Sequence, residues 1–375
     1  MKIEQTAQRP QHDESRLPSL DGWRAASILM VLGFHATWAA GLPDSFKPVL
    51  RSIFDGDLGV RCFFIISGFL ITWLMILETT RAGSVSLRAF YARRCLRILP
   101  VYIGFLCVLG ALQLIGAAEQ SSASWLGNLT FTRNFWGEDP ISEHLWSLSV
   151  EEQFYLLWPA AFLFFGGSKN AKGVMLILLA AIIAAPLFRA ANYGLVPNLC
   201  KPLFYYNSFC RRCDSLAFGC ASAIVYARQR SLIESYFLPR PWLIATCGIG
   251  LVCLPYVLAW YFVGIMPVAN SLQAIGICIL ILHSVANPKW GFYQILNWRW
   301  VRQIGLLSYS IYIWQQLFWT PPANTGLSHI WWLGIWVIPV FGTAIISHYF
   351  LERPFLKLRA RHRVPLLTEK QIHHG

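Results

Sequence analysis

An arginine and a histidine share one apolar segment near the start of the chain, which runs from Leu20 to His35. In a helix, the eleven steps from Arg24 to His35 make about three turns, so both side chains lie on one face roughly 16 Å apart. Imidazole exchanges a proton near neutral pH, as a general base or a nucleophile in acyl transfer must. The pattern predicts such chemistry at His35, at mid-depth of a membrane, with Arg24 at the rim. The alternative is a structural histidine that hydrogen-bonds to a neighbouring helix.

Three arginines precede a later apolar run. Arg94 and Arg97 are three residues apart and are therefore neighbours on a helical face, with Arg93 beside them. Guanidinium groups match phosphate oxygens in bidentate geometry, so the group predicts a site for a phosphorylated cosubstrate. The alternative is that these arginines only keep their end of the span in the cytoplasm.

Two adjacent carboxylates, Glu151 and Glu152, open another apolar run. Ser149 followed at the third position by Glu152 is typical of a capping box, in which the carboxylate satisfies amides at a helix start. Glu151 has no such role in this pattern. We predict that Glu151 orients an imidazole or binds an acceptor hydroxyl, although it is expected nearer the outer face than His35.

The composition is that of a membrane protein. Hydrophobic residues make up 56% of the 375 residues and charged residues 13%, whereas a soluble domain carries about 25% charge. The net charge of +13 is spread over short loops between apolar runs and not over one soluble face. We interpret it as a topology signal and predict no nucleic-acid partner.

Apolar runs of about 20 residues predict an all-α bundle of ten membrane spans. With both termini in the cytoplasm, the inner segments hold 23 of the 31 Lys and Arg residues, which predicts that orientation. The spans are roughly 23–41, 58–77, 98–117, 150–167, 173–189, 213–227, 241–262, 267–285, 303–319 and 329–350.

The predicted organisation is one transmembrane domain, residues 20–358, between cytoplasmic tails at 1–19 and 359–375. No clear small-x-small site follows the first span, so we expect it to be retained and not cleaved as a signal peptide. Cys210 and Cys213 have redox or zinc spacing, but no second Cys or His pair lies near them in sequence. The sequence therefore predicts no metal site.

Seven motifs, in this order, resemble the membrane-bound acyltransferase 3 family over about residues 17–358. They are Asp21-Gly-Trp-Arg24 with His35; Phe63-Phe-Ile-Ile-Ser-Gly-Phe-Leu70; Arg94-Cys-Leu-Arg97-Ile-Leu-Pro100; Trp146-Ser-Leu-Ser-Val-Glu-Glu-Gln-Phe-Tyr155; Arg212-Cys-Asp-Ser-Leu-Ala-Phe-Gly219; Ser308-Tyr-Ser-Ile-Tyr-Ile-Trp314; and Leu351-Glu-Arg-Pro354. Each motif alone is weak, and the set is specific.

The resemblance implies an enzyme of a bacterial inner membrane that transfers an acyl group, commonly acetyl, from acyl-CoA to a hydroxyl. The implied acceptor is a polysaccharide, a lipid-linked glycan or a glycosylated metabolite. Membrane lipids are the other expected partners.

The resemblance also implies roles for residues. Arg24 and His35 match the family's catalytic pair, and the family associates the positions of Arg94 and Arg97 with the donor. We add Glu151 to the catalytic group and Arg93 to the donor site. One departure is Gln315, where the family commonly has histidine; Gln315 hydrogen-bonds but takes no proton near neutral pH. From the matching motifs, the residues expected at the substrate are Asp21, Trp146, Ser147, Glu152 and Tyr155.

Two other classes of function are alternatives to acyl transfer. In a transporter or flippase, His35 would relay protons and the arginines would escort an anionic lipid or glycan. The chain has no clear inverted repeat and no matching pair of Gly- or Pro-broken spans. A receptor-like scaffold without chemistry is the third class. Neither alternative explains the joint arginine and histidine patterns.

Overall fold

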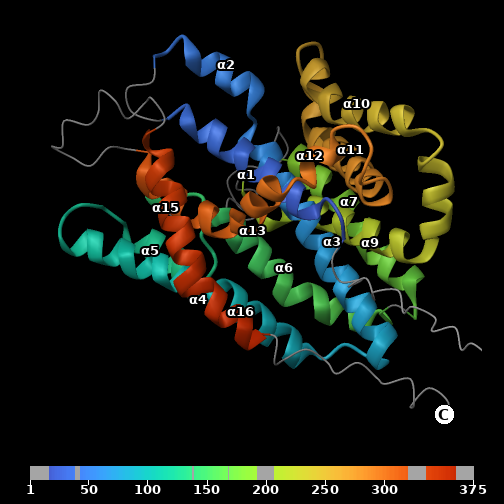
Figure 1. Cartoon of the computed structure of the whole chain (residues 1–375), viewed down its shortest axis with the longest axis horizontal. Helices are drawn as coiled ribbons and strands as arrows, with labels where there is room; N and C mark the ends of the chain where they lie inside the picture. The colour runs from blue at the N-terminus through green and yellow to red at the C-terminus, as the bar shows by residue number, and fades with distance from the viewer. Residues whose placement is uncertain are drawn as a thin grey trace, which may run out of the picture.

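The computed structural model describes residues 17–38, 43–136, 139–167, 169–191, 207–319 and 335–359, and all regular structure in these ranges is helical. The ends of the two predicted tails, 1–16 and 360–375, lie outside the described residues. So do residues 39–41 of the first predicted span and 329–334 of the last. Figure 1 shows the helices packed as one bundle.

A helix overlaps each of the ten predicted ranges. These helices are α1 (Leu20–Ala36), α3 (Gly56–Ala82), α4 (Leu87–Leu114), α6 (Leu145–Phe164), α7 (Ala171–Ala191), α9 (Phe209–Phe237), α10 (Pro241–Ala259), α11 (Met266–Ala286), α13 (Arg299–Trp314) and α15 (Val337–Ser347). Shorter helices join or extend them: α2 (Phe46–Ile53), α5 (Ser122–Leu129), η1 (Pro140–Ser142), η2 (Val263–Ile265), α12 (Tyr293–Leu296), η3 (Gln315–Phe318), η5 (His348–Glu352) and α16 (Arg353–Arg359).

Within the described ranges, five helical stretches are long and apolar enough to cross a membrane by length and composition. They are Phe46–Ala82, Leu87–Leu114, Ala171–Ala191, Pro241–Ala259 and Met266–Ala286. Among the other helices, α1, α13 and α15 have 17, 16 and 11 residues, fewer than the about 20 residues of a typical span.

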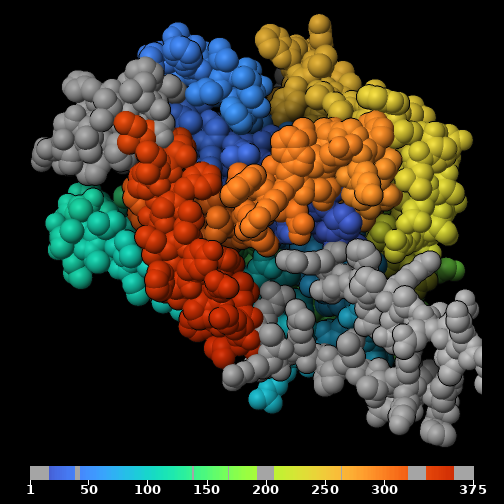
Figure 2. Space-filling model, in the orientation of Figure 1, coloured from blue at the N-terminus to red at the C-terminus, as the bar shows by residue number. Residues whose placement is uncertain are grey.

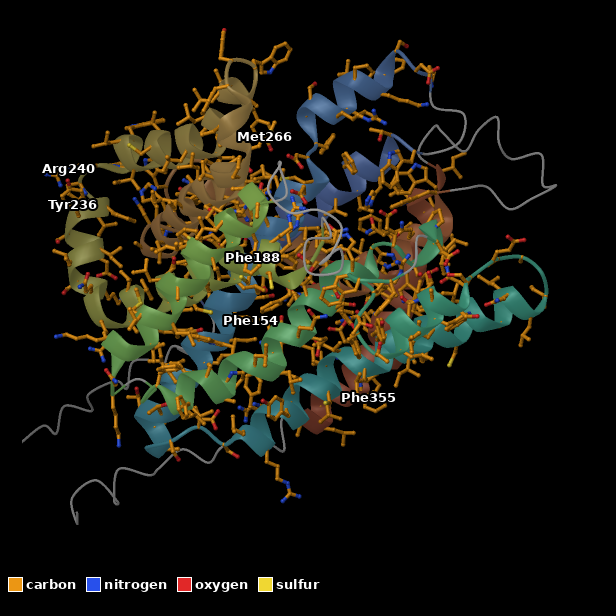
Figure 3. All side chains as sticks on the ribbon, turned by 180° about the vertical axis from the view of Figure 1, so that it is seen from behind. Phe154, Phe188, Tyr236, Arg240, Met266 and Phe355 are labelled. Carbon is orange, nitrogen blue, oxygen red and sulfur yellow. The ribbon has the colours of Figure 1, made fainter. Side chains whose placement is uncertain are left out.

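Helix α3 lies at the centre of the packing and belongs to both hydrophobic cores. Its residues Phe64 and Ile71 face the core that α4, α6 and α13 share, whereas Ile65 and Phe69 face the core made with α9 and α11. Phe154 of α6 belongs to the first core and lies near the middle of the molecule in Figure 3. Tyr236 and Arg240, where α9 turns into α10, lie at one edge of the same view.

Glycines let two pairs of helices approach to backbone contact. A Cβ atom at Gly68 of α3 would lie 2.1 Å from the Leu216 carbonyl oxygen of α9, and one at Gly305 of α13 would lie 1.8 Å from the Asp21 carbonyl oxygen of α1. No side chain fits at either position. Small residues allow this close approach between membrane helices, and these crossings position the polar residues of α1 and α3.

The predicted capping box at Ser149 is wrong. Helix α6 already begins at Leu145, and the Ser149 hydroxyl donates to the Leu145 carbonyl one turn back, at 3.0 Å. The helix starts earlier because the η1 turn leads directly into it. A serine followed by glutamate three residues later occurs inside helices as well as at their starts, so the pattern alone did not locate the end. Glu152 is therefore free of the capping role.

Candidate active site

A cavity of about 710 Å³ lies between α1, α3, α4, α6, α13 and α16. Much of its wall is apolar and comes from α3. The charged residues that line it, within the described chain, are five arginines and two glutamates: Arg24, Arg81, Arg93, Arg94, Arg97, Glu78 and Glu151. The cavity therefore carries an excess of positive charge.

The arginines of α4 are held by specific contacts. The Arg94 guanidinium lies over the ring of Tyr155, 4.4 Å from its centroid, and Arg93 pairs with Glu78 of α3 at 2.7 Å. Arg94 and Arg97 both line the cavity, as neighbours on one helical face do. The structure thus brings the three predicted donor residues to one wall.

Glu151 lines the cavity from α6. Its Oε1 atom accepts a hydrogen bond from the Ser67 hydroxyl of α3 at 2.6 Å. Ser67 is near the middle of α3, so Glu151 lies beside the middle of that helix. The nitrogen Nδ1 of His35 meets Gln315 and not Glu151, so Glu151 does not orient this imidazole.

Two hydroxyl groups mark the other end of the cavity. Ser147 of α6 and Tyr312 of α13 both line it and are joined by a short hydrogen bond. The Tyr312 hydroxyl also donates to the His144 carbonyl oxygen at 2.9 Å. Tyr312 lies only three residues before Gln315, the partner of His35.

His35 lies in the last turn of α1 and is not among the residues that line the cavity. Its Nδ1 atom is 3.2 Å from Oε1 of Gln315, and its ring packs on Trp319 with 3.9 Å between centroids. The neighbouring Phe34 contacts Gly56, the first residue of α3, whereas Arg24 shares the cavity with mid-helix Ser67. Relative to α3, His35 therefore lies toward the first residue of that helix and Arg24 lies farther along it.

The other predicted substrate residues are divided. Ser147 and Tyr155 line the cavity. Trp146 is not among the lining residues and packs on Phe64 and under the Arg212 guanidinium. Asp21 lies in the first turn of α1. Glu152 does not line the cavity, and its buried Oε1 atom has no hydrogen-bond partner among the described residues.

Glu352 is a buried carboxylate to which the sequence analysis gave no role. It ends the π-helix η5 and accepts hydrogen bonds from the Ser310 hydroxyl at 3.1 Å and from His348 Nδ1 at 2.9 Å. It is close enough to Arg97 and Arg24 to interact with both electrostatically. The Leu351-Glu-Arg-Pro354 motif was the signal, but its distance in sequence from the arginines hid the connection.

Within the described residues, no group of three His, Cys, Asp or Glu side chains could hold a metal ion. Cys210 and Cys213 are free thiols in the first turns of α9.

Figure 2 shows that α15 and α16 (red) form a continuous ridge on the face of the molecule seen there, beside the orange surface of the segment from α11 to α13.

The chain is similar to a known protein family and to several curated proteins. Residues 17–351 match the family described as "Acyltransferase domain". The chain is 28% identical to the peptidoglycan O-acetyltransferase OatA of Listeria monocytogenes, over 91% of this chain and 56% of the relative. It is 27% identical to the putative peptidoglycan O-acetyltransferase YrhL of Bacillus subtilis, over 90% and 54%. It is 25% identical to the O-acetyltransferase OatA of Staphylococcus aureus, over 91% and 57%.

The chain thus spans about half the length of the curated relatives it matches. No solved structure matches it. The family match covers nearly the whole chain, and five of the described helical stretches are long and apolar enough to cross a membrane. The chain belongs to the Acyltransferase domain family.

Proposed function

We propose that this protein transfers an acetyl group from acetyl-CoA, bound in the arginine-lined cavity, to a hydroxyl of a carbohydrate acceptor. The observation that carries the proposal is the distribution of charge in the cavity. Five arginines face two glutamates, and most of them gather where α3 ends and α4 begins. Phosphate groups are the ligands that such a cluster of guanidinium forks suits best.

The length of the cavity supports a long, thin donor. Lining residues of α3 extend from Val60 to Arg81, which at 1.5 Å per residue is about 31 Å. Between the arginines and the Ser147–Tyr312 end, the α3 wall carries side chains such as Leu70, Leu74 and Met75. A phosphate-bearing head at the cationic end and an extended arm along the apolar wall match this arrangement.

The proposed orientation places the arginine end in the cytoplasm and the His35 end at the outer face of a bacterial inner membrane. About ten spans and two cytoplasmic termini complete this topology. Arg81, Arg88 and Arg93 surround the turn between α3 and α4, and cytoplasmic loops are enriched in such residues. Acetyl-CoA would then enter from the compartment that supplies it.

In the proposed reaction, His35 acts between the thioester and the acceptor. The imidazole either removes the hydroxyl proton as that oxygen attacks the carbonyl carbon, or first takes the acyl group itself and passes it on. In both routes the carbon–sulfur bond breaks, a carbon–oxygen bond forms, and the proton leaves with the thiol. The thioester reaches His35 by passing Tyr312, which lies on the same helical segment as Gln315.

The proposed acceptor is a cell-envelope glycan. The names of two relatives specify peptidoglycan, and Trp38, whose side chain is 45% exposed, packs against His35. An aromatic ring beside the reacting group offers a flat surface with a polar edge, as carbohydrate binding requires. Mass spectrometry of envelope glycans and metabolites, with and without the protein, would identify the acceptor by its missing acetyl group.

The donor site is tested by titrating acetyl-CoA into purified protein in nanodiscs. Arg94→Ala and Arg97→Ala should each weaken binding by about 1.5–3 kcal/mol per charge-assisted hydrogen bond lost, or roughly 10- to 150-fold. Arg94→Lys and Arg97→Lys should keep only part of the affinity for acetyl-CoA that the alanine variants lose, because an ammonium keeps the charge and loses the planar fork. Arg230→Ala, whose side chain is exposed and pairs with Glu234 outside the cavity, is the matched control.

The same preparation separates an enzyme from a transporter. Wild-type protein that binds no acetyl-CoA, yet moves a labelled lipid or glycan across proteoliposomes, would replace the enzymatic proposal with transport. Melting temperatures of all variants, measured in parallel, show whether weaker binding reflects the lost contact or a damaged fold.

A further inference from the structure

The short helix η3 and the residue after it lie against the imidazole of His35. Gln315, the first residue of η3, is fully buried, and Trp319, directly after η3, is 5% exposed. Gln315 meets Nδ1 of His35 through its amide oxygen, and Trp319 packs on the face of the imidazole.

The contact with Gln315 favours one tautomer of the neutral His35 imidazole. An amide oxygen only accepts hydrogen bonds, so the proton of the neutral imidazole is on Nδ1, which donates to Gln315. The lone pair is therefore on Nε2. This is the state that a general base or nucleophile needs, and Gln315 holds it without any charge of its own.

The amide nitrogen of Gln315 and the indole nitrogen of Trp319 are both buried, and neither has a hydrogen-bond acceptor among the residues that the structure describes. Buried N–H groups nearly always find an acceptor, because leaving one unpaired costs free energy. Two such donors belong to side chains that touch one imidazole. Unpaired donors at this position suit a ligand that brings its own acceptor atom.

We propose that Gln315 Nε2–H and Trp319 Nε1–H form the oxyanion site for the acyl group that is transferred at His35. The inference rests on the acyl transfer proposed above. When a nucleophile attacks the thioester, the carbonyl oxygen gains negative charge while the new bond to carbon forms. The oxygen lone pair then re-forms the carbonyl double bond as the carbon–sulfur bond breaks, and the sulfur leaves with the bonding electron pair and takes up the proton to become the thiol.

Both donors are neutral and belong to buried side chains packed against His35, next to the atom at which this charge develops in the proposed reaction. Their hydrogen bonds strengthen as charge develops, which lowers the barrier more than it tightens substrate binding. Gln315 thus has two roles: its oxygen orients His35, and its nitrogen receives the acyl oxygen. The site selects a carbonyl oxygen as its ligand.

The test uses Trp319→Phe, which removes the N–H and keeps an aromatic ring on His35. We expect kcat to fall about 10²–10³-fold, the effect of losing one oxyanion donor, with the KM for acetyl-CoA and the melting temperature unchanged. Gln315→Glu keeps an oxygen that accepts from His35 but replaces the Nε2–H donor, so its kcat should fall at least as far. Trp314→Phe is the matched control, because its buried indole also lacks an acceptor within the described chain but packs on Phe105 of α4.

A second measurement reports on the carbonyl oxygen itself. In dithioacetyl-CoA, sulfur replaces that oxygen and accepts hydrogen bonds poorly. Wild type and Trp314→Phe should strongly prefer acetyl-CoA, and Trp319→Phe should lose much of that preference. A structural role for Trp319 would leave the ratio unchanged.

Two results would overturn the oxyanion site and leave the proposed function standing. One is a kcat within about twofold of wild type in both Trp319→Phe and Gln315→Glu. The other is an unchanged preference for acetyl-CoA over dithioacetyl-CoA in Trp319→Phe. No turnover of acetyl-CoA by wild type would overturn both.

Discussion

At the scale of single residues, His35 and the arginine-lined cavity are separate features. His35 contacts Gln315, Trp38 and Trp319 near one end of α3, whereas Arg24 lies beside the cavity at the middle of α3. One helix thus carries both groups but presents them to different surroundings. We expect substitutions at the two positions to affect different steps.

Replacing His35 should abolish the reaction and spare the donor site. In His35→Gln and His35→Ala, acetyl transfer should fall by at least the 10²–10⁴-fold that general acid–base catalysis contributes. Binding of acetyl-CoA should stay near wild type, because His35 does not line the cavity. Turnover and titration on the same purified samples measure both effects. Near-normal turnover by His35→Gln would eliminate the mechanism.

At the scale of helices, the site depends on how closely α3 approaches α9. The contact is reciprocal, since a Cβ at Gly219 of α9 would lie 2.1 Å from the Ile65 carbonyl oxygen, just as one at Gly68 would meet Leu216. Ser67, the partner of Glu151, is next to Gly68. A shift of α3 at this crossing would therefore move the hydroxyl that holds Glu151.

Gly68→Val should destabilise the protein severely, because its side chain meets backbone atoms that cannot move aside. Overpacking commonly costs about 1–3 kcal/mol, and more where backbone must shift. We expect a lower melting temperature and a lower yield of folded protein in detergent. Gly250→Ala of α10 is the control, because its added Cβ meets no atom within 4 Å. Equal melting temperatures for the two variants would show that the crossing tolerates a side chain.

At the scale of the whole molecule, the bundle joins residues from both ends of the chain. Arg24 of α1, Arg97 of α4 and Leu356 of α16 line one cavity, and Glu352 provides a carboxylate behind the arginines. The proposed catalytic and donor residues are thus held by helices that are far apart in sequence. The direction in which this bundle crosses the membrane decides from which compartment each substrate arrives.

Reporter fusions test that direction. A fusion after Gly375 and one in the 286–302 segment should report a cytoplasmic position, and one between α4 and α6, within 118–145, an external position. Paired reporters that are active on opposite sides of the membrane control for poor expression. An external position for the C-terminus would reverse the proposed topology and remove the cytoplasmic route to the arginines.

The sequence by itself determined the class of the protein and most of its helices. Hydropathy and length act locally, so apolar runs predicted a helix in each of the ten ranges. The grouping of Arg93, Arg94 and Arg97 followed from helical periodicity, which also depends only on neighbouring residues.

Only the tertiary structure decided which of these groups meet. Glu151 pairs with Ser67, His35 with Gln315, and Glu352 lies near Arg97, over separations of 84, 280 and 255 residues. The ends of α1 and α6 also differ from the predicted ones, because packing and the preceding turn place them. Contacts between distant helices depend on how whole faces pack together, and no spacing along the chain records that.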